Sequence, residues 1–179
     1  DTGYVYCLSR RVDGQDRTLG SMKTQLFQGN IYLRSVVYNP VGNGSSMLAR
    51  REALEGAGGY NSDPELQGAE DNLAQIIISR KWRVVAVPRY LTGYRVVETS
   101  LSSDFEHMAR RRLAVLRHVS ESFPETPSTA LLLAEGRIRA MVAVQAFRRY
   151  KLWQGLSEMV RALHLAPLCT LEIVAANTG

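Results

Sequence analysis

The chain has 179 residues, which is the length of one ordinary domain, or of one domain with an appendage. Hydrophobic residues make up 45% and charged residues 22% of the chain, so disorder throughout is excluded. Its richest apolar stretch, residues 130–134, is followed by Glu135, Gly136 and Arg137, and it falls short of the roughly 18 residues that a spanning helix needs. The sequence therefore predicts a globular protein without a transmembrane segment.

Strands and helices are predicted to alternate over the first hundred residues. Residues 4–11 are aromatic and β-branched and lead into a turn at residues 13–16, so they predict a strand. Residues 30–38 predict a second extended stretch, which ends at Asn39-Pro40. The small residues 42–46 that follow permit close approach of the backbone to another group.

Two helices and two further strands complete this first part. Residues 47–57 predict a short helix that ends at Gly58-Gly59, where a left-handed turn costs little. Residues 69–80 predict a helix with Glu70 and Asp71 in its first turn, where the helix dipole favours anions. Residues 83–87 predict a strand that Pro88 stops, and residues 90–97 predict another extended piece.

The remainder of the chain is predicted to be mainly helical. Asp104 is the expected N-cap of a helix over residues 105–119, and Pro124 and Pro127 break the helical pattern after it. Residues 128–163 predict a longer helical region that Gly155 interrupts. The expected fold class is therefore α/β over residues 1–104, followed by a helical extension over residues 105–179.

The cysteine and histidine content argues against a zinc site or a disulfide framework. Two cysteines, Cys7 and Cys169, form no CxxC pair, and the chain has three histidines. This usage fits a cytoplasmic protein.

One ordered set of short motifs points to chemistry. It consists of GNGSSMLARREALEGAGGY at residues 42–60, GAEDNLA at 68–74, VVAVPRYLTGYRV at 84–96 and SLSS at 100–103. Together these motifs resemble the second half of the family 2 glycosyltransferases, which are inverting enzymes with the GT-A fold. The resemblance covers roughly residues 3–118. It implies transfer of a sugar from a nucleotide-diphosphate-sugar to a hydroxyl group of a saccharide or lipid-linked acceptor.

The resemblance assigns the general base to Asp71. A sugar hydroxyl that attacks an anomeric carbon must lose its proton as the bond forms, and a carboxylate within about 3 Å can accept it. Glu70 is then expected beside the acceptor or in support of the loop. The competing interpretation is that both carboxylates only stabilise the start of a helix, by about 0.3 to 1 kcal/mol at a surface site.

Two further groups of substrate-binding residues follow from the same resemblance. Gly44, Ser45 and Ser46 match a segment that lies close to the donor sugar, although a simple turn explains them equally well. Tyr94 and Arg95 match a "YR" pair near the donor phosphates, where a guanidinium can neutralise a leaving diphosphate. An ordinary arginine at the end of a strand is the alternative for Arg95.

The sequence also departs from the family pattern. Val97 stands where many members have a histidine that helps to close a metal site, and Asn72 stands where an aromatic residue commonly follows the acidic pair. Neither the nucleotide-binding half nor an Asp-x-Asp metal motif is present. The resemblance therefore implies that Mg²⁺ or Mn²⁺ belongs to the full-length enzyme, that this fragment binds no metal, and that it is inactive alone.

A binding module is the rival to the transferase. The formal net charge is +5, and the excess of Lys and Arg lies in the C-terminal part, where Arg110, Arg111 and Arg112 form one run and Arg148, Arg149 and Lys151 form another. These runs would suit nucleic acid or an anionic membrane surface, including peripheral contact with the inner face of the membrane, unless they are solvated helix faces.

Loss of a nucleotide-binding half would also leave surface uncovered around residues 4–8 and 31–37. We therefore expect a homo-oligomer, joined there or through the helix face of residues 130–144.

Overall fold

The computed structural model describes residues 1–22, 25–97 and 104–177. The SLSS motif at residues 100–103 lies outside the described residues. The chain divides into two compact units, Asp1–Ser103 and Asp104–Gly179. The first unit is an α/β arrangement with a small mixed sheet, and the second is helical.

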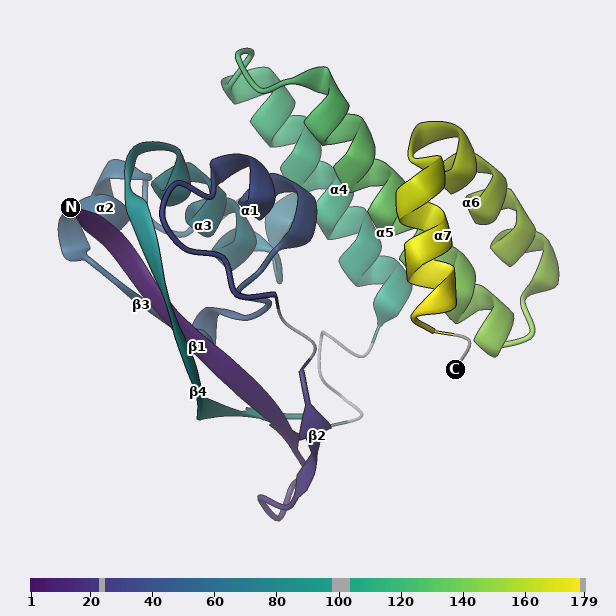
Figure 1. The fold of residues 1–179 in the computed structure, drawn as a ribbon, viewed down its shortest axis with the longest axis horizontal. Coiled ribbons are helices and arrows are strands. Elements are labelled where there is room, and N and C mark those ends of the chain that lie inside the picture. Colours follow the sequence, from purple (N-terminus) through teal and green to yellow (C-terminus); the bar gives the residue numbers. More distant parts are fainter. Residues whose placement is uncertain (23–24, 98–103, 178–179) are drawn as a thin grey trace. The chain divides into compact units, whose positions relative to one another are not determined.

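The sheet of the first unit is built around one long strand, β1 (Thr2–Val12). β1 pairs antiparallel with β2 (Thr18–Ser21) and with β3 (Met47–Ala49), and it pairs parallel with β4 (Arg83–Arg95). β1 and β4 run side by side along most of their length (Figure 1). The strand predicted over residues 4–11 is therefore confirmed as the central strand of the sheet.

β4 is one strand where two were predicted. Pro88 does not stop it, because the extra residues are absorbed by shifts in register: Cys7 pairs with Val87, whereas Leu8 pairs with Tyr90. Proline has no backbone N–H to donate to a neighbouring strand, so it is tolerated in a sheet at edges and at β-bulges. The predicted break is thus an irregularity within a continuous strand.

Within the described residues of the first unit, three helices and two short 3₁₀ turns accompany the sheet. These are α1 (Tyr32–Tyr38), η1 (Gly44–Ser46), α2 (Arg51–Gly56), η2 (Pro64–Leu66) and α3 (Glu70–Lys81). The helix predicted over residues 69–80 is confirmed as α3. The helix predicted over residues 47–57 is confirmed only from Arg51, since Met47–Ala49 form β3. Gly58 and Gly59 end α2 with φ angles of 82° and 72°, as expected.

The prediction of an extended stretch over residues 30–38 is wrong, because this segment forms α1. Ile31, Ser35 and Val36 are buried, and their spacing places them on one side of a helix that packs on α3. β-branched residues favour strands only weakly, and burial against a neighbouring element overrides that preference.

Two surfaces expected to be uncovered are therefore covered. Tyr4 and Tyr6 are buried in β1, which is paired on both sides, and they belong to a core cluster with Ile31, Ile78 and Val84. Residues 31–37 offer no strand edge because they are helical. Residues 4–6 likewise offer no free strand edge, since β3 and β4 both pair with them, and self-association of the chain stays a prediction.

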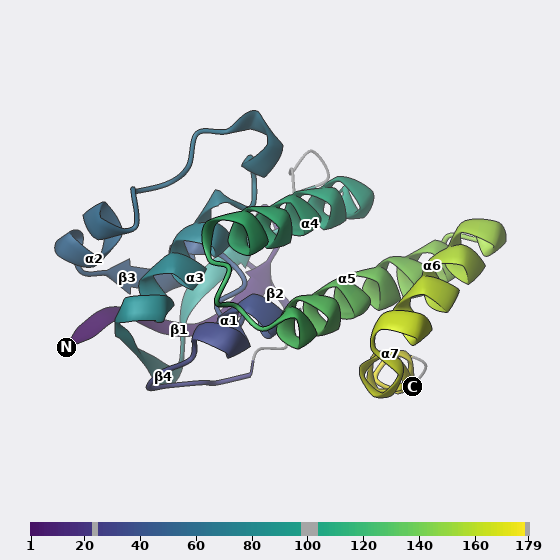
Figure 2. The same ribbon diagram turned by 90° about the horizontal axis from the view of Figure 1, so that it is seen from above.

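The second unit consists of α4 (Phe105–Ser122), α5 (Ser128–Arg148), α6 (Leu152–Leu165) and α7 (Pro167–Ala175) within its described residues. Asp104 Oδ1 accepts a hydrogen bond from the His107 backbone N–H at 2.9 Å, which confirms the predicted N-cap. α4 and α5 lie side by side (Figure 2), and α5 also contacts α6 and α7.

The helical region after Ser128 breaks at Arg149–Lys151, and the predicted interruption at Gly155 is wrong. Gly155 lies inside α6, where a Cβ atom would come within 2.7 Å of the Phe147 ring. The glycine is therefore needed for close packing of α6 on the end of α5. The buried residues of α5 also show that much of the 130–144 face, which was expected to join protomers, packs inside this unit.

Among the helices of the described residues, none is long and apolar enough to cross a membrane.

Candidate functional site

The fold brings the small-residue segment 42–46 against the start of α3. A Cβ atom at Gly44 would lie 3.3 Å from Asp71 Oδ2 and 3.4 Å from Asp71 Cβ. η1, which contains Gly44, also contacts β1 and β4. Two segments that the sequence singled out separately therefore meet at one carboxylate.

The Asp71 carboxylate is partly buried, and its environment makes it a better proton acceptor than an exposed aspartate. Burial raises the pKa of Asp71 above its ordinary 3.8, and the neighbouring charge of Glu70 adds to this. The Asn72 backbone N–H donates to Asp71 Oδ1 at 2.7 Å. This hydrogen bond and the one from the Gly44 backbone N–H lower the pKa of Asp71 and so oppose the effect of burial. Burial is the largest of these effects, so the pKa of Asp71 is raised.

Ser46 is used to hold η1 in place. Its hydroxyl donates to Asn43 Oδ1 at 2.9 Å, and Asn43 Nδ2 donates to Ser9 Oγ at 3.1 Å. Ser9 Oγ and Ser46 Oγ are also hydrogen bonded to each other. All three residues are buried, so this cluster attaches η1 to β1. Ser45, by contrast, is exposed next to Gly44.

Glu70 supports its own loop. Its Oε2 atom accepts a hydrogen bond from the Gly68 backbone N–H, and Gly68 has a φ of 88°. Glycine adopts a positive φ of this kind more readily than residues with a side chain do. The carboxylate of Glu70 is thereby engaged in shaping the turn that leads into α3.

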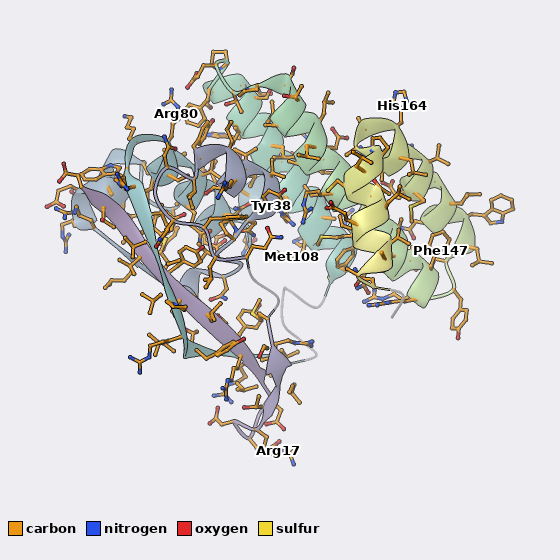
Figure 3. The ribbon with its side chains drawn as sticks, viewed as in Figure 1. Arg17, Tyr38, Arg80, Met108, Phe147 and His164 are labelled. Carbon is orange, nitrogen blue, oxygen red and sulfur yellow. The ribbon has the colours of Figure 1, made fainter. Side chains whose placement is uncertain are left out.

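Tyr94 and Arg95 lie at the far end of β4, opposite Arg11 and Val12 of β1. Arg95 Nη2 binds Asp16 Oδ1 at 2.7 Å and its Nη1 donates to the Asp13 carbonyl oxygen at 3.0 Å. These contacts attach the guanidinium to the β1–β2 turn, which also carries Arg17 (Figure 3). The structure thus joins Gly44 and Asp71, whereas Arg95 contacts the β1–β2 turn instead.

Two buried amides lie on α3: Asn72, which the sequence marked only as a departure from the family pattern, and Gln75, which sequence reasoning missed. Asn72 Nδ2 and Gln75 Nε2 have no hydrogen-bond partner within residues 1–22, 25–97 and 104–177. Both side chains are buried, and their spacing places them on one side of α3. The sequence does show two amide residues within the otherwise apolar stretch 72–78, which is the pattern that could have identified them. Asn43 and Ser9 were likewise missed, since only the fold makes them partners.

A concavity of about 190 Å³ lies within the helical unit between α4, α5 and α6. Three of its charged side chains are engaged within the unit: Arg139 binds Glu158 at 2.9 Å, and Glu106 binds Lys151 at 2.6 Å. Chemistry is therefore better sought at Asp71.

No group of three or more His, Cys, Asp or Glu side chains is placed to hold a metal ion in the part of the chain that the structure describes. Comparisons with protein-family models, curated proteins and solved structures gave no match to this chain. A functional proposal therefore rests on the geometry around Asp71 and on the ordered motifs of the sequence.

Proposed function

We propose that residues 1–104 form the acceptor-side half of a GT-A glycosyltransferase of the family 2 type, with Asp71 as its general base. The enzyme would transfer a sugar from a nucleotide-diphosphate-sugar to an acceptor hydroxyl with inversion. This chain supplies the base and the surface around it, and the nucleotide pocket belongs to a half that the chain does not contain.

One observation carries the proposal: Asp71 Oδ2 faces a glycine. Because Gly44 has no side chain, the carboxylate oxygen is not covered by a Cβ atom on that side, where one would lie at 3.3 Å. The other oxygen, Oδ1, is held by the Asn72 N–H. A carboxylate with one oxygen fixed, the other beside a glycine, and a raised pKa has the properties that a general base needs.

The proposed step is a single displacement. The acceptor oxygen forms a bond to the anomeric carbon while the bond from that carbon to the diphosphate oxygen breaks, and the electron pair leaves with the nucleoside diphosphate. Asp71 Oδ2 takes the proton of the acceptor hydroxyl as the new bond forms. Attack from the side opposite the leaving group inverts the anomeric centre.

Arg95 fits a supporting part in this scheme. Its guanidinium is half-exposed and held by the exposed carboxylate of Asp16. Exposed ion pairs of this kind contribute about 0 to 1 kcal/mol, so exchange of the carboxylate for phosphate oxygens costs little. Tyr94 precedes it on β4 and would accompany it at the donor.

The test is Asp71→Asn in an enzyme that joins this chain to its nucleotide-binding half. Transfer is measured with a panel of nucleotide-sugars, and donor binding is measured separately by calorimetry. Asparagine keeps the size and the contact with the Asn72 N–H but takes up no proton, so we expect turnover to fall by about 10² to 10⁴ with donor affinity unchanged.

Glu70→Gln is the matched control, because it changes the neighbouring carboxylate that supports the loop. We expect a milder loss from this variant. Near-parental turnover of Asp71→Asn would show that the base lies elsewhere and that the acidic pair only begins α3.

A further inference from the structure

α6 exposes a continuous apolar row to solvent. Leu152, Leu156, Val160 and Leu163 are all exposed, and their spacing of four, four and three residues places them on one side of the helix. Trp153 lies beside this row with 85% of its surface exposed. We call the four aliphatic residues the α6 row.

The α6 row is separate from the side of α6 that packs inside the unit. Gly155 and Ala162 are buried, Gly155 beneath the Phe147 ring and Ala162 in a cluster with Ala140 of α5. α6 therefore already has a packing partner on one side. The α6 row is additional apolar surface that the described part of the helical unit leaves uncovered.

The turn before α6 also presents an aromatic ring, and it does so under strain. Tyr150 has a φ of 59° and is 89% exposed. Its N–H donates to the Phe147 carbonyl at 3.0 Å and the Lys151 N–H donates to the Ala146 carbonyl at 2.9 Å, which is the Schellman pattern that glycine usually ends. A tyrosine held in this strained conformation with its ring in solvent suggests that the ring has a functional role, such as binding.

Cations accompany these apolar groups. Arg149 and Lys151 lie in the turn next to Tyr150, and Arg161 lies on α6 itself. Arg148 ends α5, where its guanidinium donates to the Asn177 carbonyl oxygen at 2.7 Å. Lys151 binds Glu106 at 2.6 Å and Arg161 binds Glu158 at 3.1 Å, and both pairs are partly exposed. His164 in the last turn of α6 is labelled in Figure 3.

We propose that α6 and the turn before it lie on the surface of an anionic lipid bilayer. The α6 row would enter the boundary between headgroups and acyl chains, and the Tyr150 and Trp153 rings would lie at headgroup level. The cations of the turn would contact lipid phosphates, at about 1 kcal/mol for each Lys or Arg near the surface. This surface belongs to the second unit, so it does not depend on the chemistry proposed for Asp71.

The charges favour a bilayer over a second copy of the chain. A self-complementary interface needs carboxylates to meet its cations. The acidic side chain of α6 itself is Glu158, which Arg139 and Arg161 already bind. The nearby Glu106 is likewise engaged, by Lys151. The other arginine run offers less to a surface, because the Nε atom of Arg112 is buried inside the described part of the chain.

The first experiment measures co-sedimentation of the 179-residue chain with vesicles of phosphatidylcholine, with and without phosphatidylglycerol. We expect binding to the mixed vesicles that weakens as salt is raised. Leu156→Gln should lower the affinity about fivefold to tenfold, because part of a leucine side chain no longer leaves water. Leu132→Gln on α5, where the leucine is similarly exposed, is the matched control and should bind like the parent.

The second experiment tests the aromatic residues and the cations. In a Trp82→Phe background the fluorescence reports Trp153 alone, and it should shift to shorter wavelength on mixed vesicles. Tyr150→Gly and Arg149→Gln should each lower the affinity, the latter about fivefold. Circular dichroism confirms that each variant is folded.

Three results would overturn the proposal. One is the absence of binding to the mixed vesicles, and another is an equal loss of binding in Leu156→Gln and Leu132→Gln. The third is a dimer in sedimentation velocity that Leu156→Gln dissociates while the parent ignores vesicles, since the α6 row would then cover a second copy.

Discussion

Asp71 is the residue at which stability and the proposed chemistry conflict. Its carboxylate is partly buried next to Glu70, and burial raises its pKa. The ionised carboxylate has a higher free energy in the folded chain than in water, because burial removes part of its hydration. A general base must nevertheless be ionised to accept a proton. The fold accepts this cost at a position where Gly44 leaves one oxygen without a Cβ neighbour.

Asp71→Asn should therefore raise the free energy of unfolding at neutral pH. Below the ordinary pKa of 3.8 the carboxyl group is protonated in both states, so parent and variant should be equally stable. As pH rises from there through the raised folded pKa, ionisation favours the unfolded parent, and the difference grows to a plateau. Urea unfolding at several pH values measures this. A parent that gains stability over the variant with rising pH would contradict the raised pKa.

Gly44→Ala tests the close approach to Asp71. The new methyl group would lie 3.3 Å from Asp71 Oδ2 and displace solvent there, so the pKa of Asp71 should rise further. In the joined enzyme the acidic limb of the pH–rate profile should move to higher pH, with a fall in turnover. Gly14→Ala, where a Cβ would meet nothing within 4 Å, should leave the profile unchanged.

At the scale of elements, α5 and the junction of α6 with α7 approach each other closely at Gly136. A Cβ atom there would come within 2.5 Å of Ala166 Cβ and 3.3 Å of the Ala166 backbone nitrogen. A backbone neighbour cannot move aside as the end of a flexible side chain can. The helical unit therefore depends on a glycine inside α5, despite the cost of glycine in a helix.

Gly136→Ala should accordingly destabilise the chain by about 1 to 3 kcal/mol, the usual cost of overpacking. Gly56→Ala is the control, since a Cβ at that glycine of α2 meets nothing within 4 Å. The control should be neutral or stabilising by about 0.4 to 1 kcal/mol. Urea denaturation of both variants decides the matter, and a stabilised Gly136→Ala would refute the close approach.

In the turn between α5 and α6, a substitution is expected to stabilise the chain. Tyr150→Gly relieves the left-handed conformation and should stabilise the chain by about 1 kcal/mol. Tyr150→Ala removes the ring but keeps the strain, so it should bring no such gain. Thermal unfolding compares the two, and equal effects would mean that strain at this residue is unimportant.

For the whole molecule, the sheet leaves one side of β4 open. Apart from a bridge between Gly29 and Val84, the outer edge of β4 pairs with no other strand among the described residues. Val85, Tyr90 and Leu91 of this strand are exposed. An exposed strand edge with apolar side chains is a site for pairing with another chain.

We expect the chain to self-associate through this edge. Light scattering should show a mass above that of the 20.0 kDa monomer as concentration rises. Leu91→Lys should weaken the association, because a charge on an edge strand opposes pairing. Leu48→Lys, on the exposed side of β3, is the control. A monomer at all concentrations would dismiss the prediction.

Local chemistry in the sequence determined the elements whose signals lie within a few residues. Asp104 capped α4, Gly58 and Gly59 ended α2, and the acidic pair began α3, because each of these effects acts over one helical turn. The resemblance could likewise single out Gly44 and Asp71 one at a time. Nothing local showed that the two would touch.

Tertiary structure decided what depends on distant partners. Residues 32–38 became a helix because Ile31, Ser35 and Val36 are buried on one side of it, which no neighbour in the sequence dictates. Pro88 remained inside a strand because the register of β1 could shift around it. The contact of Gly44 with Asp71 has the same origin: it joins segments separated in the chain, and only the packing of η1 against α3 creates it.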